Sequence, residues 1–120
     1  MKNGERLLLL LNDLSAAISS FEGSLLIDLA RYDELERDVF KNGQIQKFEY
    51  SVELLWKVVK KFLEVKRESV VLYPKDALKA FFSEDAINER TYLVLMDAIQ
   101  SRNLLSHVYK ARSSIRFIQN

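Results

Sequence analysis

Hydrophobic side chains recur along this chain at the three- and four-residue spacing of an α-helix. The first such row contains five positions: Leu7, Leu11, Leu14, Ile18 and Phe21. Gly23 follows the row, and glycine is common where helices end. The row therefore predicts a helix up to about residue 23. Residues 24–40 are less regular because a group of acidic residues interrupts the apolar pattern, so we expect a short helix or an ordered loop there.

The clearest row lies in the middle of the chain. It comprises six positions: Ile45, Phe48, Val52, Leu55, Val59 and Phe62. Trp56 and Leu63 widen the apolar face beyond the narrow seam of a two-stranded coiled coil, so we expect both in the core. On the opposite side, Glu53, Lys57 and Lys61 follow one another at steps of four. This pattern predicts a helix over about residues 43–65.

The remaining sequence predicts two more helices and a short closing one. Pro74 fits the first turn of a helix whose inward residues are Ala77, Leu78, Phe81 and Phe82. A further helix is expected from Asn88 to about Leu105, with four buried positions: Tyr92, Leu95, Met96 and Ile99. A separate closing helix is expected after Tyr109. Together these elements predict an all-α fold, an antiparallel four- to five-helix bundle that forms a single domain over residues 1–120.

Composition narrows the range of functions. The 120 residues include 3 Gly, 1 Pro, 1 His and no Cys. The absence of cysteine excludes disulfides, thiol nucleophiles and cysteine-bound zinc, and we expect neither a metal site nor a cofactor. The net charge of +1 implies no general attraction to nucleic acid or membrane. A membrane-spanning helix needs about 20 apolar residues, which no segment supplies, and the run over residues 7–11 is short for a signal peptide. We therefore expect a cytoplasmic protein without membrane contact.

Polar residues that could carry chemistry gather between Arg102 and Tyr109. On a helix, which turns about 100° per residue, Arg102, Ser106 and Tyr109 fall within about 60° of one another. Asn103 and His107 form a neighbouring strip, about 100–140° from Arg102. Arginine offers a planar fork for phosphate, and histidine exchanges protons near neutral pH. Spacing alone favours a simpler interpretation, in which His107 stabilises the helix dipole and the other side chains extend into solvent.

The distribution of charge along the chain affects what residues 102–109 could bind. After Asp97 the chain has no acidic residue, but it carries four cations: Arg102, Lys110, Arg112 and Arg116. Such a region would attract an anion such as an RNA backbone or a nucleotide phosphate, or it would be a solvated basic tail. Elsewhere we find no glycine-rich phosphate loop and no paired aspartates for a two-metal transferase site. Glu49 and Glu53 are expected to be solvated, or to pair with a lysine or arginine of a neighbouring helix.

Three segments resemble a known family when they are taken together. Residues 41–63 (KNGQIQKFEYSVELLWKVVKKFL), 74–80 (PKDALKA) and 102–109 (RNLLSHVY) are similar, in order and spacing, to the motifs of the nucleotidyltransferase substrate-binding proteins. That family belongs to the HEPN superfamily of small helical bundles. The resemblance implies a homodimer and a partner, a minimal nucleotidyltransferase that carries the catalytic carboxylates missing here. The leading expectation is an accessory substrate-binding subunit without nucleotidyltransferase activity of its own.

The same resemblance implies an alternative, a metal-independent ribonuclease toxin that its partner antitoxin silences by transferring AMP to Tyr109. His107 would then act as general acid or base, Arg102 would stabilise charge on the phosphate, and Asn103 would support them. RNA or a nucleotide would be bound through four side chains: Arg102, Ser106, Lys110 and Arg112. A structural helical dimer without a ligand is a second alternative. Whether the chain is an enzyme therefore stays open at the level of the sequence.

Overall fold

Four α-helices and one 3₁₀ turn make up the computed structural model, which describes residues 2–67 and 70–119, with the backbone alone for Arg67 and for residues 106–119. In chain order the elements are α1 (Asn3–Leu25), the turn η1 (Leu29–Arg31), α2 (Glu34–Arg67), α3 (Pro74–Ser83) and α4 (Glu89–Gln119). No strand occurs within these residues. The predicted all-α bundle is confirmed, with four helices.

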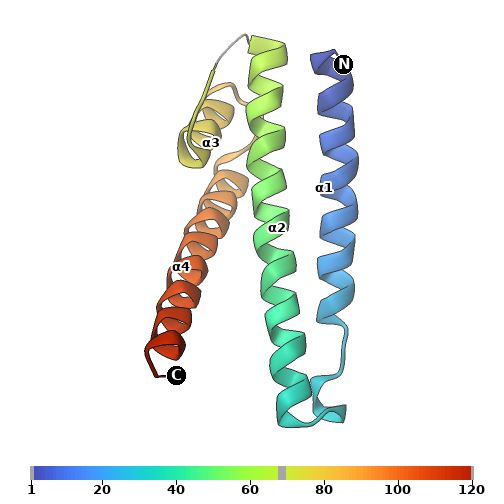
Figure 1. The fold of residues 1–120 in the computed structure, drawn as a ribbon. Coiled ribbons are helices and arrows are strands. Elements are labelled where there is room, and N and C mark those ends of the chain that lie inside the picture. Colours follow the sequence, from blue (N-terminus) through green and yellow to red (C-terminus); the bar gives the residue numbers. More distant parts are fainter. Residues whose placement is uncertain (1, 68–69, 120) are drawn as a thin grey trace.

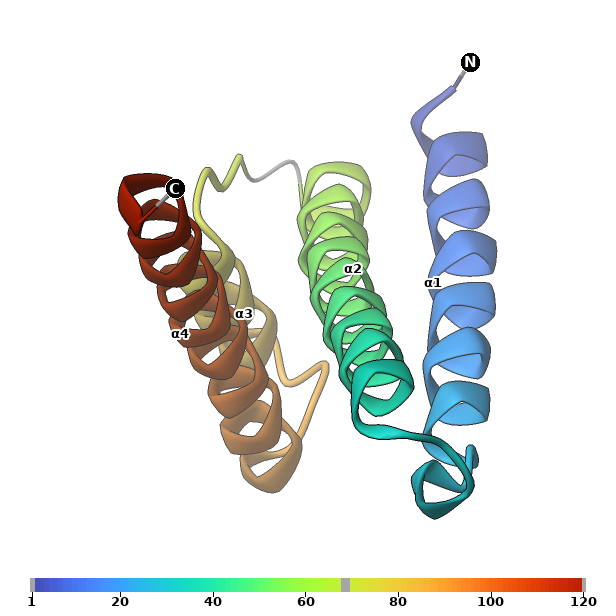
Figure 2. The same cartoon turned by 60° about the horizontal axis from the view of Figure 1, so that its bottom comes forward.

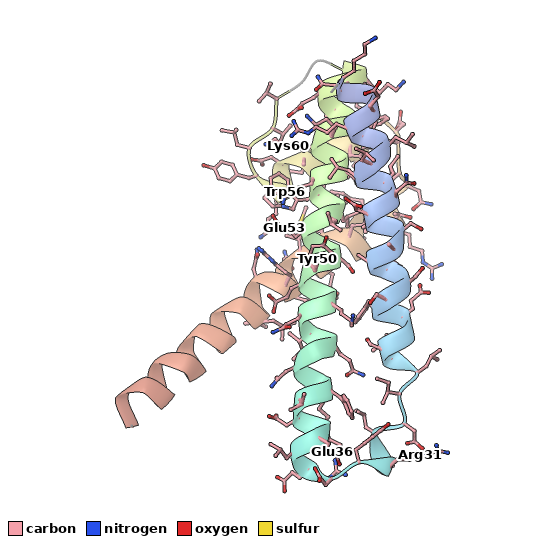
Figure 3. All side chains as sticks on the ribbon, turned by 45° about the vertical axis from the view of Figure 1, so that its right-hand side comes forward. Arg31, Glu36, Tyr50, Glu53, Trp56 and Lys60 are labelled. Carbon is pink, nitrogen blue, oxygen red and sulfur yellow. The ribbon has the colours of Figure 1, made fainter. Side chains whose placement is uncertain are left out.

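The long helix α2 lies at the centre of the molecule. Figures 1 and 2 show α1 running antiparallel to it on one side and the pair α3 and α4 on the other. Helix α2 packs against all three of the others, whereas α1 packs chiefly on α2. The second half of α4 extends away from α1 and α2 (Figure 3). The molecule has principal extents of 49 × 33 × 32 Å, and its long dimension is close to the length of the 34-residue helix α2, about 51 Å.

The hydrophobic core lies where α2, α3 and α4 meet. Its buried side chains come from all three helices: Val52, Val59, Leu63, Ala77, Leu78 and Ile99. Phe62 of α2 and Phe81 of α3 add an edge-to-face ring contact at 5.3 Å between centroids. All eight of these residues were predicted to face inward, and the structure confirms them. Packing of this core therefore holds α3 and the first half of α4 against α2.

The apolar row of α1 includes exposed positions. Leu11 and Ile18 are 44% and 40% exposed, while Ala17 is the buried residue of this helix. Because α1 packs mainly on the one helix α2, only a narrow strip of its surface is covered. The apolar row of α1 is therefore only partly buried within this chain.

Two helix boundaries differ from the prediction. Helix α2 begins at Glu34 because Asp33 and Glu36 form a reciprocal cap: Glu36 N–H donates to Asp33 Oδ1 at 2.8 Å, and Asp33 N–H donates to Glu36 Oε1 at 3.1 Å. The acidic group that was interpreted as a break is thus the start of the helix. Helix α4 runs without interruption to Gln119, so the separate closing helix predicted after Tyr109 is wrong.

The other predicted boundaries are close to the observed ones. Helix α1 ends at Leu25, two residues past Gly23, and Pro74 occupies the first turn of α3. Asn88 caps α4, its Oδ1 accepting from Thr91 N–H at 2.8 Å. Within the described ranges, no helix combines the length and the apolar character needed to cross a bilayer.

Candidate functional site

The candidate segment begins on the part of α4 that the core holds against α2. Ile99, one turn before Arg102, is only 1% exposed and anchors this part of the helix. Arg102 therefore comes to lie beside α2, at the level of Glu53. Its side chain is 33% exposed, so the guanidinium group stands at the edge of the helix interface and not in open solvent.

Arg102 forms an ion pair with Glu53. Arg102 Nη2 donates to Glu53 Oε2 at 3.1 Å, and Glu53 Oε1 lies 3.8 Å from Lys57 Nζ. Each carboxylate oxygen thus faces one cation. This confirms that Glu53 pairs with an arginine of a neighbouring helix, as expected for a structural carboxylate. An anion that approached Arg102 would have to compete with Glu53.

Among the described atoms, the guanidinium group of Arg102 lacks a full set of hydrogen-bond partners. Arg102 Nη1 donates to Asn103 Oδ1 over a long 3.4 Å, and Arg102 Nε is buried without a hydrogen-bond partner among the described atoms. A buried donor without an acceptor lowers stability. Arg102 and Asn103 are consecutive in the chain, so their contact does not test the predicted site. Glu53 joins them from α2.

The other candidates continue along α4 beyond this cluster. They are Ser106, His107, Tyr109, Lys110 and Arg112, whose backbone is helical and whose side chains lie outside the described residues. Their proposed roles in catalysis, modification and substrate binding stay predictions. Among the described side chains, no group of three or more His, Asp and Glu could hold a metal ion.

The sequence analysis did not identify a cluster of three lysines on α2, formed by Lys57, Lys60 and Lys61. Trp56, which was expected in the core, is only partly buried, and Lys60 Nζ lies 5.5 Å from the centroid of its ring. Figure 3 shows Glu53, Trp56 and Lys60 following one another along α2. The spacing of Lys57, Lys60 and Lys61 was the available signal, because residues three and four apart share a helix surface.

Comparison with known proteins yields one match. The family model described as nucleotidyltransferase substrate binding protein like matches residues 9–120, which extends the similarity through most of α1. No curated protein and no solved structure is similar enough to this chain to count as a match.

Proposed function

The chain belongs to the nucleotidyltransferase substrate-binding protein family, and on this premise we propose that it is the accessory subunit of a two-component minimal nucleotidyltransferase. Its role is to bind the substrate that receives the nucleotidyl group, while the partner supplies the catalytic carboxylates. The observation that carries the proposal is the family match over residues 9–120.

Binding to the partner is the decisive test. A minimal nucleotidyltransferase encoded next to this chain should co-purify with it, and calorimetry should give a dissociation constant in the micromolar range or below. The isolated chain should release no pyrophosphate from nucleoside triphosphates, whereas the pair should. Two proteins that do not associate at micromolar concentration would contradict the proposal.

We further propose that the subunit is a homodimer, because a single copy leaves much surface uncovered. The chain exposes 8894 Å², whereas a monomeric protein of 14.0 kDa typically exposes about 6,700 Å². The excess, roughly 2,200 Å² for one chain on that scale, is larger than the area of about 800 Å² that each partner buries in a protein interface of standard size. Exposed apolar side chains on α1 contribute to it: Leu8, Leu9, Leu11, Ile18 and Leu25.

A ribonuclease toxin is the alternative that the spacing of Arg102 and His107 supports. His107 as general acid or base would contribute about 10²–10⁴-fold to the rate. The ion pair with Glu53 weighs against this role, because it shares the charge that Arg102 would offer to a phosphate. The purified chain should cleave RNA if the alternative holds, and His107→Ala should abolish cleavage. No cleavage, or equal cleavage by the variant, would exclude it.

The remaining alternative is a structural dimer without a ligand. Any ligand that binds the folded state raises its melting temperature. If neither RNA nor a nucleotide raises the melting temperature at millimolar concentration, and no partner binds, the structural dimer is the alternative that the results support.

A further inference from the structure

A hollow of about 260 Å³ lies between the first half of α1 and the second half of α2. Its lining comes from both helices: Arg6, Leu10, Trp56, Lys57, Lys60, Lys61 and Glu64. Four of these side chains are cationic and one is a carboxylate. The lining therefore carries more positive than negative charge, although the net charge of the whole chain is only +1. The hollow is distinct from the segment that contains His107.

Contacts within the protein hold the three lysines in place. Lys60 Nζ lies 5.5 Å from the ring centroid of Trp56, and Lys61 Nζ lies 2.7 Å from Glu64 Oε2. Lys57 Nζ lies 3.8 Å from Glu53 Oε1, a carboxylate that it shares with Arg102. Their ammonium groups are therefore partly ordered around the hollow before any ligand arrives, which lowers the entropic cost of binding one.

Among the described side chains, fewer carboxylates than cations lie near the hollow. Glu64 faces Lys61, and Glu53 is divided between two cations. Within the part of the chain that the structure describes, neither Arg6 nor Lys60 forms an ion pair with a carboxylate. Like charges three and four residues apart also disfavour a helix slightly. An anion bound in the hollow would relieve this repulsion between cations.

We propose that this hollow binds the di- or triphosphate group of a nucleoside phosphate. Cations from two helices can contact several phosphate oxygens at once, and Arg6 can do so with two parallel hydrogen bonds. A pocket for a whole drug-sized ligand is commonly about 300–1,000 Å³, so the hollow suits the charged part of a nucleotide. The inference goes beyond the proposed function, because it concerns the isolated chain and requires no partner.

The fluorescence of Trp56 can be used to detect binding in the hollow. Trp56 is the only tryptophan in the chain and lines the hollow, so its fluorescence responds to a ligand bound there. We expect ATP and inorganic pyrophosphate to change the emission with saturable curves, and adenosine to leave it unchanged. The affinity should fall as salt is added, because exposed charges are screened. No response to pyrophosphate at millimolar concentration, or a response to ATP alone, would overturn the proposal.

Matched substitutions distinguish a site from general attraction to a basic protein. Arg6→Gln and Lys60→Gln should each weaken pyrophosphate binding about three- to fivefold, as expected for partly exposed charges. Lys41→Gln removes the same charge from α2 outside the hollow and should leave binding unchanged. Because Lys60→Gln alters the surroundings of Trp56, calorimetry is the readout for the variants. An equal loss in Lys41→Gln would overturn the proposal. Failure of the partner to bind would leave this result unaffected, so the two proposals can fail separately.

Discussion

At the scale of single residues, the distinctive feature is a carboxylate shared by two cations. Glu53 lies between Arg102 and Lys57, and Arg102 Nε is buried with no hydrogen-bond partner among the side chains that the structure describes. The two ion pairs differ in burial: the Arg102 side chain is 33% exposed, and that of Lys57 is 49% exposed. Solvent screens the second pair more strongly than the first. The two contacts should therefore differ in their effect on stability.

Glu53→Gln should lower the free energy of unfolding by about 1 kcal/mol, because it leaves a partly buried guanidinium without its counter-charge. Urea denaturation monitored by circular dichroism measures the change. Lys57→Gln is the matched control and should alter stability by less than about 0.5 kcal/mol. Equal effects of the two substitutions would show that Glu53 does not act through Arg102.

At the scale of elements, local caps decide where two helices begin. Asp33 and Glu36 exchange hydrogen bonds at the start of α2, and Asn88 caps α4. Each cap satisfies backbone N–H groups that have no acceptor within the helix. The sequence contained both signals. We interpreted the first as a break because its acidic residues interrupt the apolar row.

Asp33→Ala should destabilise the protein by about 1 kcal/mol and lower its helical content, because the first turn of α2 loses its cap. Urea denaturation and far-ultraviolet circular dichroism measure the two effects. Asp38→Ala, one turn further along the same helix, is the control, since the Asp38 side chain is exposed and takes no part in the cap. A similar loss of stability in both variants would show that the effect comes from the removed charge and not from the lost cap.

Helix α3 is short, with 10 residues, and depends on packing. An isolated helix of this length is not stable in water, so the fully buried Ala77 and Leu78 must hold it on α2 and α4. Leu78→Ala should cost about 2–5 kcal/mol because it leaves a cavity in the core. Leu72→Ala, at a position 67% exposed, should have little effect. Thermal denaturation of both variants measures the difference. A small loss of stability in Leu78→Ala would show that the core can collapse around the missing atoms.

At the scale of the whole molecule, one chain is more extended than a compact domain. Its radius of gyration is 17.1 Å, against about 13.6 Å for a compact domain of the same 120 residues. The shape follows from the packing: α1 is covered chiefly by α2, and the second half of α4 leaves the bundle (Figure 3). A second copy would cover surface that this chain leaves open.

The purified protein should therefore have a mass of twice 14.0 kDa in light scattering. Its melting temperature should rise with protein concentration, since association stabilises the folded state. Ile18→Glu, which places a charge on the exposed row of α1, should shift the mass toward one chain, whereas Glu22→Gln should not. A wild-type mass of one chain at micromolar concentration would contradict the homodimer.

The amino-acid sequence by itself determined the all-α class and most of the core, whereas the number of helices stayed open between four and five. Val52, Val59, Leu63 and Ile99 were recognisable because helical periodicity is a local property, which neighbouring residues express directly. Glu53 was expected to pair with a cation, but its partner, 49 residues away, was not identifiable.

Only the tertiary structure decided that Arg102 meets Glu53, and that Arg6 of α1 meets Trp56 and Lys60 of α2 around one hollow. Such contacts depend on the angle and the register at which helices pack, which the side chains of all the helices set together. The same packing left the apolar row of α1 only partly covered, because within one chain α1 packs chiefly on α2.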